Sequence, residues 1–562
     1  MVFNEIFNSL NKNNSPEGVP IVLTSPPNEI SDYNLDPFVA FLSSFPNNFL
    51  LRTVVKKKFL NPKDDEDGKA VFAPYGLRKV ESLLLEKFEK SDIAVVHPGN
   101  LHRFVGPKTK VIGISTMDPM GLAYATTTYT SILALGNESI NNAEFRNLIS
   151  HPAIQKYKPK IIVGGGGAWQ IEEEKKLDEY NIDTLVLGEG ENSVVDIFHQ
   201  AVNGGKLPRI IRSTRPSPNS VPVIRHASTY GVVEITRGCG RGCQFCSPTM
   251  RYRTSFPLGH IMKEVKINIE CGSKMIFLAT EDIFLYKSER KFIPNREAVI
   301  ELVKSIADCQ GVEYIQPAHA SLAPVVYDPV MVEELSHILI EKTRWTPELR
   351  RMYKRRFISV EIGIETGSVK LMKKYMKGKA LPYKIENWPE LVTQAIGIMN
   401  DHDWYPLATI MTGLPGETEE DTLATLDLVD ELKHYKMFIS PILFVPLEDC
   451  LLHDASRITL EHLSDLQWDF IASCFRYNFD FWVPEAKWRV MLGSFLLYVL
   501  FYSWKHGPKA FYPMIKMSGL SDTYIGRKIF KGCDPRMCNF GEEALGMKLN
   551  ESKIRMQNGG QK

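Results

Sequence analysis

The chain contains 562 residues, of which 44% are hydrophobic and 24% charged, a composition typical of a folded globular protein. Its 67 lysine and arginine residues balance 66 aspartate and glutamate residues. The formal charge of +1 excludes a broadly basic nucleic-acid-binding protein, although not a local basic patch.

The N-terminal sequence lacks the basic and apolar regions of a signal peptide, and no stretch reaches ~18 consecutive apolar residues. We therefore expect a cytoplasmic protein. The longest apolar run, 490–504, is typical of a buried core helix. A peripheral contact with the inner face of the membrane, or an apolar wall around a substrate, is the alternative for this run.

Residues 1–90 mix helical patches with a polar loop, and we expect them to form an N-terminal extension. From residue 91, short apolar runs alternate with segments of helical length. This rhythm predicts a Rossmann-like α/β domain with a parallel sheet over 91–204. The strand candidates are 91–99, 110–116, 158–167 and 183–191. The helix candidates are 126–136, 143–157 and 170–181.

Three Gly-rich turns follow strands of this domain, at 118–121, 164–167 and 188–191. Ligands of open parallel sheets bind at the carboxyl ends of the strands. Bare glycine backbone there suits the close approach of a large flat or phosphate-bearing ligand. Ordinary turn geometry would explain any one of these turns. The proline-rich and glycine-rich segment 205–228 is typical of a linker.

The strand–helix rhythm resumes over 229–449 and predicts a partial (β/α)6 barrel whose site lies at the carboxyl ends of its strands. Its strand candidates are 232–238, 273–284, 313–322, 356–368, 406–422 and 436–447. Residues 450–562 are rich in aromatic and apolar residues and are expected to be mainly helical.

Three of the nine cysteines are clustered, since Cys239, Cys243 and Cys246 follow the first barrel strand with the spacing Cys-x3-Cys-x2-Cys. An odd count, one tight cluster and no export signal favour metal binding over disulfides. A 4Fe–4S cluster takes four thiolates, so three local ligands would leave one iron open. A zinc site needs a fourth ligand, and His260 lies 14 residues further on without a pairing pattern.

The other cysteines carry weaker signals. Cys533 and Cys538 are separated by four residues, unlike the two-residue spacing of common redox pairs. They are typical of a surface loop, with a role in an additional cluster or at the active site as the alternative. The remaining cysteines occur singly and are expected to be inert thiols: Cys271, Cys309, Cys450 and Cys474.

The cysteine spacing at the start of a strand–helix barrel resembles the radical S-adenosylmethionine (radical SAM) superfamily. The resemblance implies a 4Fe–4S cluster whose open iron binds the amino and carboxylate groups of SAM. It also implies reductive cleavage of SAM to a 5′-deoxyadenosyl radical that removes a hydrogen atom from the substrate. Phe245, before the third cysteine, is the aromatic residue usual in the family.

Further phrases match the family in order over roughly 230–450. Glu281 ends the second strand, where the family often has a Gly-Gly-Glu-like turn, although the glycines are missing here. The phrase 361–368 resembles the "GIE-GS" strand end, which assigns Glu361 and Glu365 to the SAM ribose or ammonium group. The phrase 413–418 resembles the "GLPGET" turn, which places Gly413 and Gly416 near the adenine.

The domain over 91–204 resembles the cobalamin-binding domain that precedes the barrel in one class of radical SAM enzymes. Cobalamin binders of the mutase type offer an axial histidine in Asp-x-His-x-x-Gly. Met120 takes the place of that histidine and Ala123 that of the glycine, so we expect no histidine ligation. The residues expected to line the cobalamin face are Asp118, Met120, Gly164, Gly165 and Gly190. A degenerate domain without the cofactor is the alternative.

The resemblance leaves the reaction open. One outcome is carbon–carbon bond formation that builds rings into archaeal tetraether membrane lipids, favoured by the apolar C-terminal region. The other is cobalamin-dependent C-methylation of a lipid, peptide or protein. A sensor using the cluster and cobalamin is a third reading that would not need the SAM phrases. The expected partners are a hydrophobic or lipid substrate and an electron donor such as ferredoxin or flavodoxin, without a nucleic acid.

Overall fold

The computed structural model describes residues 16–133, 138–447, 450–459 and 462–482. The chain divides into two compact units, which are described separately. The first contains the described residues of Met1–Ala40 together with Val54–Met120 and Asn141–Thr229. The second contains Phe41–Thr53, Gly121–Ile140 and the described residues from Tyr230 onward.

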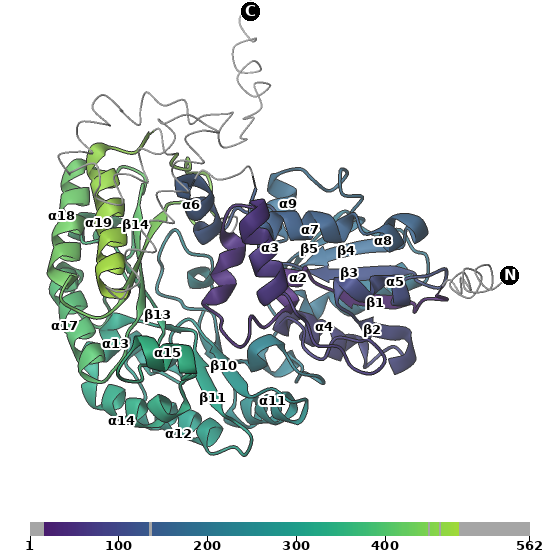
Figure 1. Cartoon of the computed structure of the whole chain (residues 1–562), viewed down its shortest axis with the longest axis horizontal. Helices are drawn as coiled ribbons and strands as arrows, with labels where there is room; N and C mark the ends of the chain where they lie inside the picture. Colours follow the sequence, from purple (N-terminus) through teal and green to yellow (C-terminus); the bar gives the residue numbers. More distant parts are fainter. Residues whose placement is uncertain (1–15, 134–137, 448–449, 460–461, 483–562) are drawn as a thin grey trace, which may run out of the picture. The chain divides into compact units, whose positions relative to one another are not determined.

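A six-stranded parallel sheet in the order β2-β1-β3-β4-β5-β6 forms the centre of the first unit (Figure 1). Short runs of Ile, Val and Leu form its inner strands because both faces of the sheet are covered, which favours continuous apolar sequences over alternating ones. The strands are β1 (Ile21–Thr24), β2 (Ile93–Val95), β3 (Val111–Ser115), β4 (Lys160–Gly164), β5 (Thr184–Gly188) and β6 (Ile210–Ser213).

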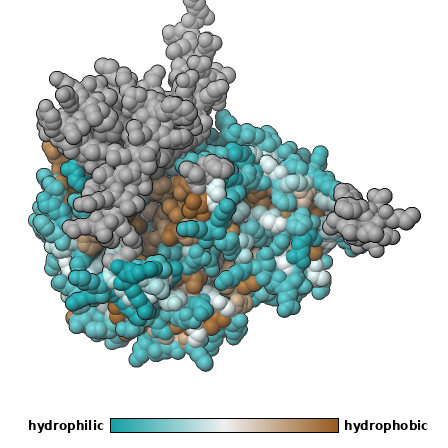
Figure 2. All heavy atoms as spheres, in the orientation of Figure 1, coloured by the Kyte–Doolittle hydropathy of each residue, from teal (hydrophilic) through white to brown (hydrophobic). Residues whose placement is uncertain are grey.

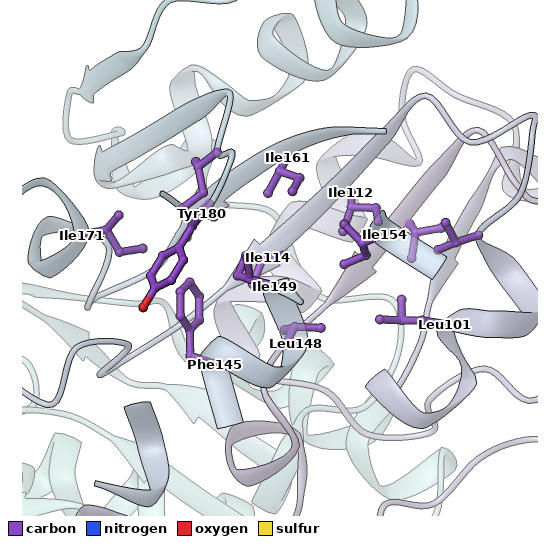
Figure 3. Close-up of a cluster of buried hydrophobic side chains, with 14 of the residues drawn as sticks. Leu101, Ile112, Ile114, Phe145, Leu148, Ile149, Ile154, Ile161, Ile171 and Tyr180 are labelled. Carbon is purple, nitrogen blue, oxygen red and sulfur yellow. The ribbon is translucent and has the colours of Figure 1, made fainter. Parts of the chain in front are cut away.

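Successive side chains of each strand enter two different cores. Ile21 and Leu23 of β1 face a core with α4 (Tyr75–Leu84) and α10 (Val194–Val202). Val22, between them, faces the core shown in Figure 3, where Phe145, Leu148 and Ile154 pack on the sheet. The helices of this second layer are α5 (Leu101–Phe104), α7 (Ile140–Ile149), α8 (Pro152–Tyr157) and α9 (Trp169–Glu173). The short helix α2 (Pro27–Ile30) follows β1 directly.

The boundaries of this unit differ from those that the sequence predicts. β1 lies within the predicted extension 1–90, yet it pairs with both β2 and β3 inside the sheet. β6 lies within the predicted linker 205–228 and pairs with β5. Residues 121–140 belong to the second unit although both flanking segments belong to the first. The prediction used the strand–helix rhythm, which begins only after β1 and says nothing about which unit a helix joins.

The second unit is built around six parallel strand positions, one of which is shared by two consecutive short strands, β11 and β12. Its strands are β7 (Val232–Glu234), β10 (Met275–Ala279), β11 (Tyr314–Pro317), β12 (His319–Ala320), β13 (Glu361–Glu365), β14 (Leu407–Thr412) and β15 (Phe438–Leu443). They form one sheet of order β11-β10-β7 and another of order β12-β13-β14-β15. Ala318 joins them, since its N–H donates to Leu278 (3.1 Å) and its carbonyl accepts from Glu361 N–H (3.0 Å). The partial six-stranded barrel is therefore confirmed.

Helices cover the outside of these strands (Figure 1). They are α11 (Leu258–Glu270), α12 (Arg296–Ala307), α13 (Leu322–Tyr327), α14 (Pro329–Leu339), α15 (Pro347–Met352), α16 (Val369–Tyr375), α17 (Trp388–Asp401) and α18 (Glu419–Leu432). Ile362 and Ile364 of β13 are buried, whereas Glu361 and Gly363 between them are only partly buried. This alternation directs apolar residues outward to the helices and polar residues into the barrel.

The outer edge of β15 is covered by two helices from distant parts of the sequence. In α19 (Asp465–Trp482), Asn478 bonds both backbone groups of Ile439, with N–O distances of 2.8 and 2.6 Å. In α6 (Tyr124–Leu133), the Thr128 hydroxyl accepts from Leu443 N–H at 2.9 Å. Side chains thus satisfy backbone groups that an edge strand would otherwise expose. The helix α3 (Phe49–Lys58) contains the position, between Thr53 and Val54, where a segment of the second unit ends and one of the first begins.

The helical prediction for 450–562 is tested only as far as Trp482, where α19 ends. The apolar run 490–504, Cys533 and Cys538 lie outside the described residues. Within the part of the chain that is described, no helix is both long enough and apolar enough to cross a membrane.

Candidate functional site

The three clustered cysteines lie in a loop between two short antiparallel strands, β8 (Thr236–Arg237) and β9 (Thr254–Ser255). Gly238, Gly240 and Gly242 alternate with the functional residues and have φ of 80°, 78° and 78°. A Cβ on Gly238 would lie 2.6 Å from the Tyr252 carbonyl oxygen. Glycine is required here because the loop reverses direction against a neighbouring backbone.

The loop is closed by its own hydrogen bonds. The Thr249 hydroxyl accepts from Gly242 N–H (2.6 Å) and Cys243 N–H (3.1 Å), and Cys239 N–H donates to the Pro248 carbonyl (3.0 Å). Cys246 N–H donates to the Cys243 carbonyl at 3.2 Å. The backbone therefore fixes the loop while the thiols form no disulfide.

Burial raises the pKa of all three thiols, that of Cys243 to about 11. The neutral thiols must lose protons to bind a metal, so binding is favoured as the pH rises. Among the described residues, no group of three or more His, Cys, Asp and Glu side chains is arranged to hold a metal ion. The fit of an iron–sulfur cluster therefore rests on the soft thiolate donors and on the glycine-rich loop that presents them.

Arg241, between two of the cysteines, is buried and joins the loop to the residues after α16 and to those that follow β12 and β10. Its guanidinium donates to the carbonyls of Gly378 (3.1 Å) and Lys379 (3.0 Å) and to the Ser321 hydroxyl (3.0 Å). It also lies 3.6 Å from the Asp282 carboxylate. A Cβ on Gly378 would lie 2.0 Å from the Arg241 carbonyl oxygen, so the two segments touch through backbone.

A buried ion pair lies beside the cysteines, because Lys379 Nζ contacts Glu365 Oε1 at 2.9 Å. Burial lowers the pKa of Lys379, but Glu365 and the charge of Cys243 outweigh it and raise that pKa. Glu365 itself has φ of 67°, at an irregularity in the pairing of β13 with β14. A Cβ on Gly363 would lie 2.0 Å from Glu365 Oε1, so Gly363 leaves the room for this carboxylate.

His319 and Glu361 form a second pair, on adjacent strands. They are in register between β12 and β13, and His319 Nε2 lies 3.2 Å from Glu361 Oε2. Its Nδ1 lies 3.1 Å from the Thr280 carbonyl oxygen. Burial lowers the pKa of His319, but Glu361 and the nearby Glu281 outweigh it and raise that pKa to about 9. The imidazole is therefore protonated at neutral pH and bonds through both nitrogens.

Glu281 lies two residues after the end of β10, the strand that pairs with β11. Burial raises its pKa, while His319 and Arg251 act in the opposite direction. Its charge in turn raises the pKa of Cys239 and Cys246. None of the ion pairs found among the described residues includes Glu281. Glu281, after the end of β10, and Glu365, the last residue of β13, thus lie near the thiols, whereas Glu361 is the first residue of β13 and pairs with His319.

The turn 413–418 is closed by hydrogen bonds to one of its own side chains. Glu417 accepts from Thr412 Oγ1 (3.1 Å) and from the Leu414 N–H (3.1 Å), and it also bonds Gly413 N–H, which closes the turn. Gly416 has φ of 74° at the exposed tip of the turn. The SAM roles predicted for Gly413 and Gly416 stay predictions, because the bonds seen serve the turn itself.

The phrase 361–368 ends in a structural clamp. Ser368 caps α16 by accepting from Leu371 N–H (3.2 Å), and its hydroxyl donates to Asp421 Oδ1 of α18 (2.6 Å). A Cβ on Gly367 would lie 2.2 Å from the Ala424 carbonyl oxygen. Gly367 and Ser368 thus set the packing of α16 on α18.

A tyrosine that the sequence did not single out also reaches the cysteine loop. Tyr124, the first residue of α6, donates from its hydroxyl to the Phe245 carbonyl. Phe245 is buried, as is usual for a residue that anchors a loop. Tyr124, Arg241 and Lys379 could not be found from spacing, because the groups they contact are far from them in sequence or belong to backbone.

At the carboxyl edge of the first sheet, the predicted cobalamin residues separate into buried and open positions. The Asp118 carboxylate is buried and accepts from Asn141 and Gln170, both at 2.9 Å. Met120 N–H donates to Gln170 Oε1 at 2.9 Å. Asp118 therefore holds the loop after β3. Its predicted place on the cobalamin face stays a prediction.

The glycines of the next turn have two roles. Gly165 has φ of 97°, and a Cβ on it would lie 2.6 Å from the Thr116 carbonyl oxygen. Gly165 is nevertheless exposed, and Gly164 and Gly190 beside it are partly exposed. Met117, which the sequence did not single out, is 63% exposed. An apolar side chain and bare backbone thus share this edge.

A partly buried carboxylate lies at that edge, at the β1–β3 switch point of the strand order. Glu29 accepts from Thr116 Oγ1 (3.0 Å), Met117 N–H (2.9 Å) and Ser25 Oγ (3.2 Å). Burial raises its pKa to about 7. Ligands of doubly wound sheets bind at such a point. Glu29 connects the ends of both strands there, a role invisible to a prediction that left β1 outside the domain.

Comparison with known proteins gives the family. Residues 233–429 match the radical SAM superfamily. A tRNA-2-methylthio-N(6)-dimethylallyladenosine synthase of Sulfurihydrogenibium is 23% identical over 328 residues, which is 56% of this chain and 68% of that protein. The same enzyme of Thermotoga petrophila is 23% identical over 50% of this chain and 58% of its own length. The ribosomal protein uS12 methylthiotransferase RimO of Clostridioides difficile is 26% identical over 49% of this chain and 56% of its own.

The fold is also similar to a solved structure. The radical SAM methyltransferase TsrM of Kitasatospora setae, with cobalamin and a [4Fe–4S] cluster bound, superimposes with a TM-score of 0.50. The match covers 77% of this chain and 74% of TsrM at 13% identity. The expected order of a Rossmann-like domain and a partial barrel is therefore confirmed as a fold. Residues 233–429 are thus the part of this chain that is similar to the radical SAM superfamily.

Proposed function

We propose that this protein is a cobalamin-dependent radical SAM methyltransferase that acts on an unactivated carbon. The observation that carries the proposal is the position of three clustered thiols on one loop, near the carboxylates of Glu281 and Glu365 at the carboxyl ends of β10 and β13. Cys239, Cys243 and Cys246 would hold a 4Fe–4S cluster. When bound, the reduced cluster supplies the electron that cleaves SAM to a 5′-deoxyadenosyl radical.

The carboxylates divide the recognition of SAM among them. Glu365 is already paired with Lys379, and Glu361 with His319. Burial raises the pKa of Glu281 although His319 and Arg251 act in the opposite direction, and no ion pair was found for it among the described residues. An incoming ammonium group would favour the ionised form of this carboxylate further. We therefore assign the SAM amino group to Glu281 and the ribose hydroxyls to Glu361 and Glu365.

Cobalamin would be held at the carboxyl edge of the first sheet. Gly165 and Met117 leave a surface there of backbone and an apolar side chain, which suits a large flat ring system. Met120 takes the place of the axial histidine of mutases, so the lower face of the cobalt would lack a histidine ligand. TsrM supports this proposal, since it carries cobalamin and a cluster on a similar fold.

Methyl transfer is favoured over the methylthio transfer of the curated relatives. Insertion of sulfur requires a sulfur donor in addition to SAM. The first 238 residues of this chain contain no cysteine, so the first unit cannot bind a second iron–sulfur cluster through thiolates. A methyl group carried by cobalamin needs no such donor.

Ring formation in tetraether lipids receives no support from the comparisons, whose proteins transfer methyl or methylthio groups. The sequence feature that favoured it, the apolar run 490–504, lies outside the described residues. The substrate class remains a part of the proposal: a hydrophobic molecule, a lipid, a peptide or a protein.

The test uses anaerobically reconstituted protein with cobalamin, a chemical reductant and SAM bearing a deuterated methyl group. Lipid extract, peptides and tRNA are offered separately, and products are analysed by mass spectrometry. Gain of the deuterated methyl supports the proposal. Loss of two hydrogens instead would indicate ring closure, and gain of sulfur with the methyl would indicate methylthio transfer; either result would contradict it.

One substitution tests the cluster assignment. We expect Cys243→Ala to abolish formation of 5′-deoxyadenosine, because the cluster would lose one of its three ligands. Cys271→Ala is the matched control, since Cys271 lies at the end of α11 away from the loop. A Cys243→Ala protein that still cleaves SAM would show that the cluster is bound elsewhere.

A further inference from the structure

Among the described residues, few side chains cover the outer side of the cysteine loop. Gly240 and Gly242, which flank Arg241, are exposed and carry no side chain. Tyr252, at the other end of the same loop, is 88% exposed. A Cβ on Gly240 would lie 3.9 Å from the Tyr252 Cα, so the backbones of these two residues lie side by side.

Basic residues surround this opening on two sides. Lys287, Arg290 and Lys291 are exposed on the segment after β10, and Lys374 and Lys377 are exposed at the end of α16. We call these five residues and Tyr252 the basic rim. Glu289 is the exposed carboxylate within the same segments. A local excess of four positive charges contrasts with a formal charge of +1 for the whole chain.

Direct contacts fix the first side of the rim to the cysteine loop. Lys287 N–H donates to Ser255 Oγ (2.8 Å), and Arg253 donates to Ser288 Oγ (2.5 Å). The guanidinium of Arg253 also lies 5.0 Å from the Phe292 ring centroid. These bonds hold the segment 287–292 against β9 and the residues before it.

The second side of the rim is attached to the loop through Gln244. Gln244 N–H donates to the Tyr375 carbonyl (2.9 Å), and its amide nitrogen donates to the Lys374 carbonyl (3.1 Å). These two hydrogen bonds attach the end of α16, with its lysines, to the cysteine loop. Charges on both sides of an opening create a positive field over it, which steers an acidic partner into place.

We propose that the basic rim is the docking surface of an acidic one-electron carrier protein, an inference that rests on the proposed function. The reduced carrier gives up one electron across the thin glycine backbone and leaves oxidised by one electron. The cluster held by the cysteines gains that electron, and no atoms are exchanged. A nucleic acid fits less well, because Tyr252 is the sole strongly exposed aromatic side chain in the rim and strand binding uses several stacking residues.

The test measures binding of a negatively charged flavodoxin in its oxidised form to the reconstituted full chain, by calorimetry over a series of salt concentrations. The variant is Lys287→Glu, Arg290→Glu and Lys291→Glu together. At low salt we expect the dissociation constant of the variant to be higher by roughly tenfold or more. We also expect it to depend much less on the salt concentration than that of the wild type. Unchanged binding would overturn the proposal.

The matched control reverses three other exposed charges, Arg350→Glu, Lys354→Glu and Arg355→Glu. These residues lie in and after α15, ahead of the amino end of β13, where Figure 2 shows a strongly hydrophilic surface. The change in total charge is identical. An equal loss of flavodoxin binding in both variants would mean that total charge alone attracts the carrier, and would overturn the proposal.

A second readout separates this inference from the proposed function. With photoreduced deazaflavin, a small neutral reductant, the rim variant should form 5′-deoxyadenosine at the wild-type rate. Loss of that activity would place the rim in the active site and overturn its role in docking. If the wild type forms none, the proposed function fails while the binding result still decides the docking surface. Loss of tRNA binding with flavodoxin binding intact would assign the rim to nucleic acid instead.

Discussion

At the scale of single residues, the cysteine loop depends on one buried arginine. Arg241 contacts the Asp282 carboxylate, the Ser321 hydroxyl and the backbone around Lys379. Lys379 in turn holds Glu365. One guanidinium thus relates the thiols to the carboxylates that we assign to SAM.

We predict that Arg241→Met changes the cluster and SAM together. It leaves Asp282 buried without its cation, and breaking a buried pair costs about 3–5 kcal/mol of unfolding free energy. We expect a changed electron paramagnetic resonance spectrum of the reduced cluster with SAM, and weaker binding of SAM. These are measured by spectroscopy and by equilibrium dialysis.

Arg253→Met is the control for this prediction. Arg253 also lies over the Phe292 ring, at 5.0 Å compared with 4.6 Å for Arg241. It bonds Ser288 rather than the segment 378–381. If both variants alter the spectrum equally, general packing around Phe292 explains the effect and Arg241 has no specific positioning role.

At the scale of elements, α16 and α18 are joined through one carboxylate. Asp421 accepts from Ser368 Oγ (2.6 Å), Thr418 Oγ1 (2.8 Å) and Lys370 Nζ (3.0 Å). Thr418 and Asp421 also form a capping box at the start of α18. Both helices follow strands that end in the predicted SAM site, so this clamp fixes the distance between the two strand ends.

We predict that Asp421→Asn destabilises the barrel in a pH-dependent way. Burial opposes ionisation, but these hydrogen bonds outweigh it and lower the pKa of Asp421 from 3.8 to about 2. A folded pKa below the unfolded one stabilises the fold at neutral pH by about 2 kcal/mol. That stabilisation is lost as the pH falls from about 4 to about 2.

The measurement is denaturant unfolding of wild type and variant between pH 7 and pH 3. The difference between them should shrink as the pH falls. Asp427→Asn is the control, because Asp427 is exposed on the same helix. A difference that is the same at all pH values would contradict the role of the charge.

At the scale of the whole molecule, β1 decides where the first unit begins. It lies between β2 and β3 and pairs with both in parallel. Ile21, Val22 and Leu23 are completely buried. The strand is therefore an interior part of the sheet even though it precedes the regular strand–helix rhythm by about 70 residues.

We predict that deletion of residues 1–30 prevents the first unit from folding, because β2 and β3 would lose their shared partner. Deletion of residues 1–15 removes no described residue and should leave the sheet intact. Limited proteolysis and hydrogen exchange of residues 93–115 would show the difference. Protection of that segment in the longer deletion would show that the sheet forms without β1.

The sequence predicted most strands of both units because buried parallel strands are short apolar runs. It missed β1 and β6, two strands of four residues each that have prolines close by on both sides. In the site, motifs located the three cysteines and the three glutamates. The partners of those glutamates were not predictable, since His319 and Glu361 are 42 positions apart and meet only through strand register. The similarity to the radical SAM superfamily is confirmed over residues 233–429, whereas the individual ligand roles stay predictions.

The path of the chain between its two units has a consequence for biosynthesis. Helix α6 leaves the ribosome long before β15, the strand whose backbone it helps to satisfy. Until that strand is made, the hydroxyls of Thr128 and Tyr129 lack their hydrogen-bond partners on β15, which are Leu443 N–H and the Ser440 hydroxyl. The barrel therefore cannot be completed in the order of synthesis, and exchanging the first unit by a single cut at 229 would leave behind a barrel without its own helix.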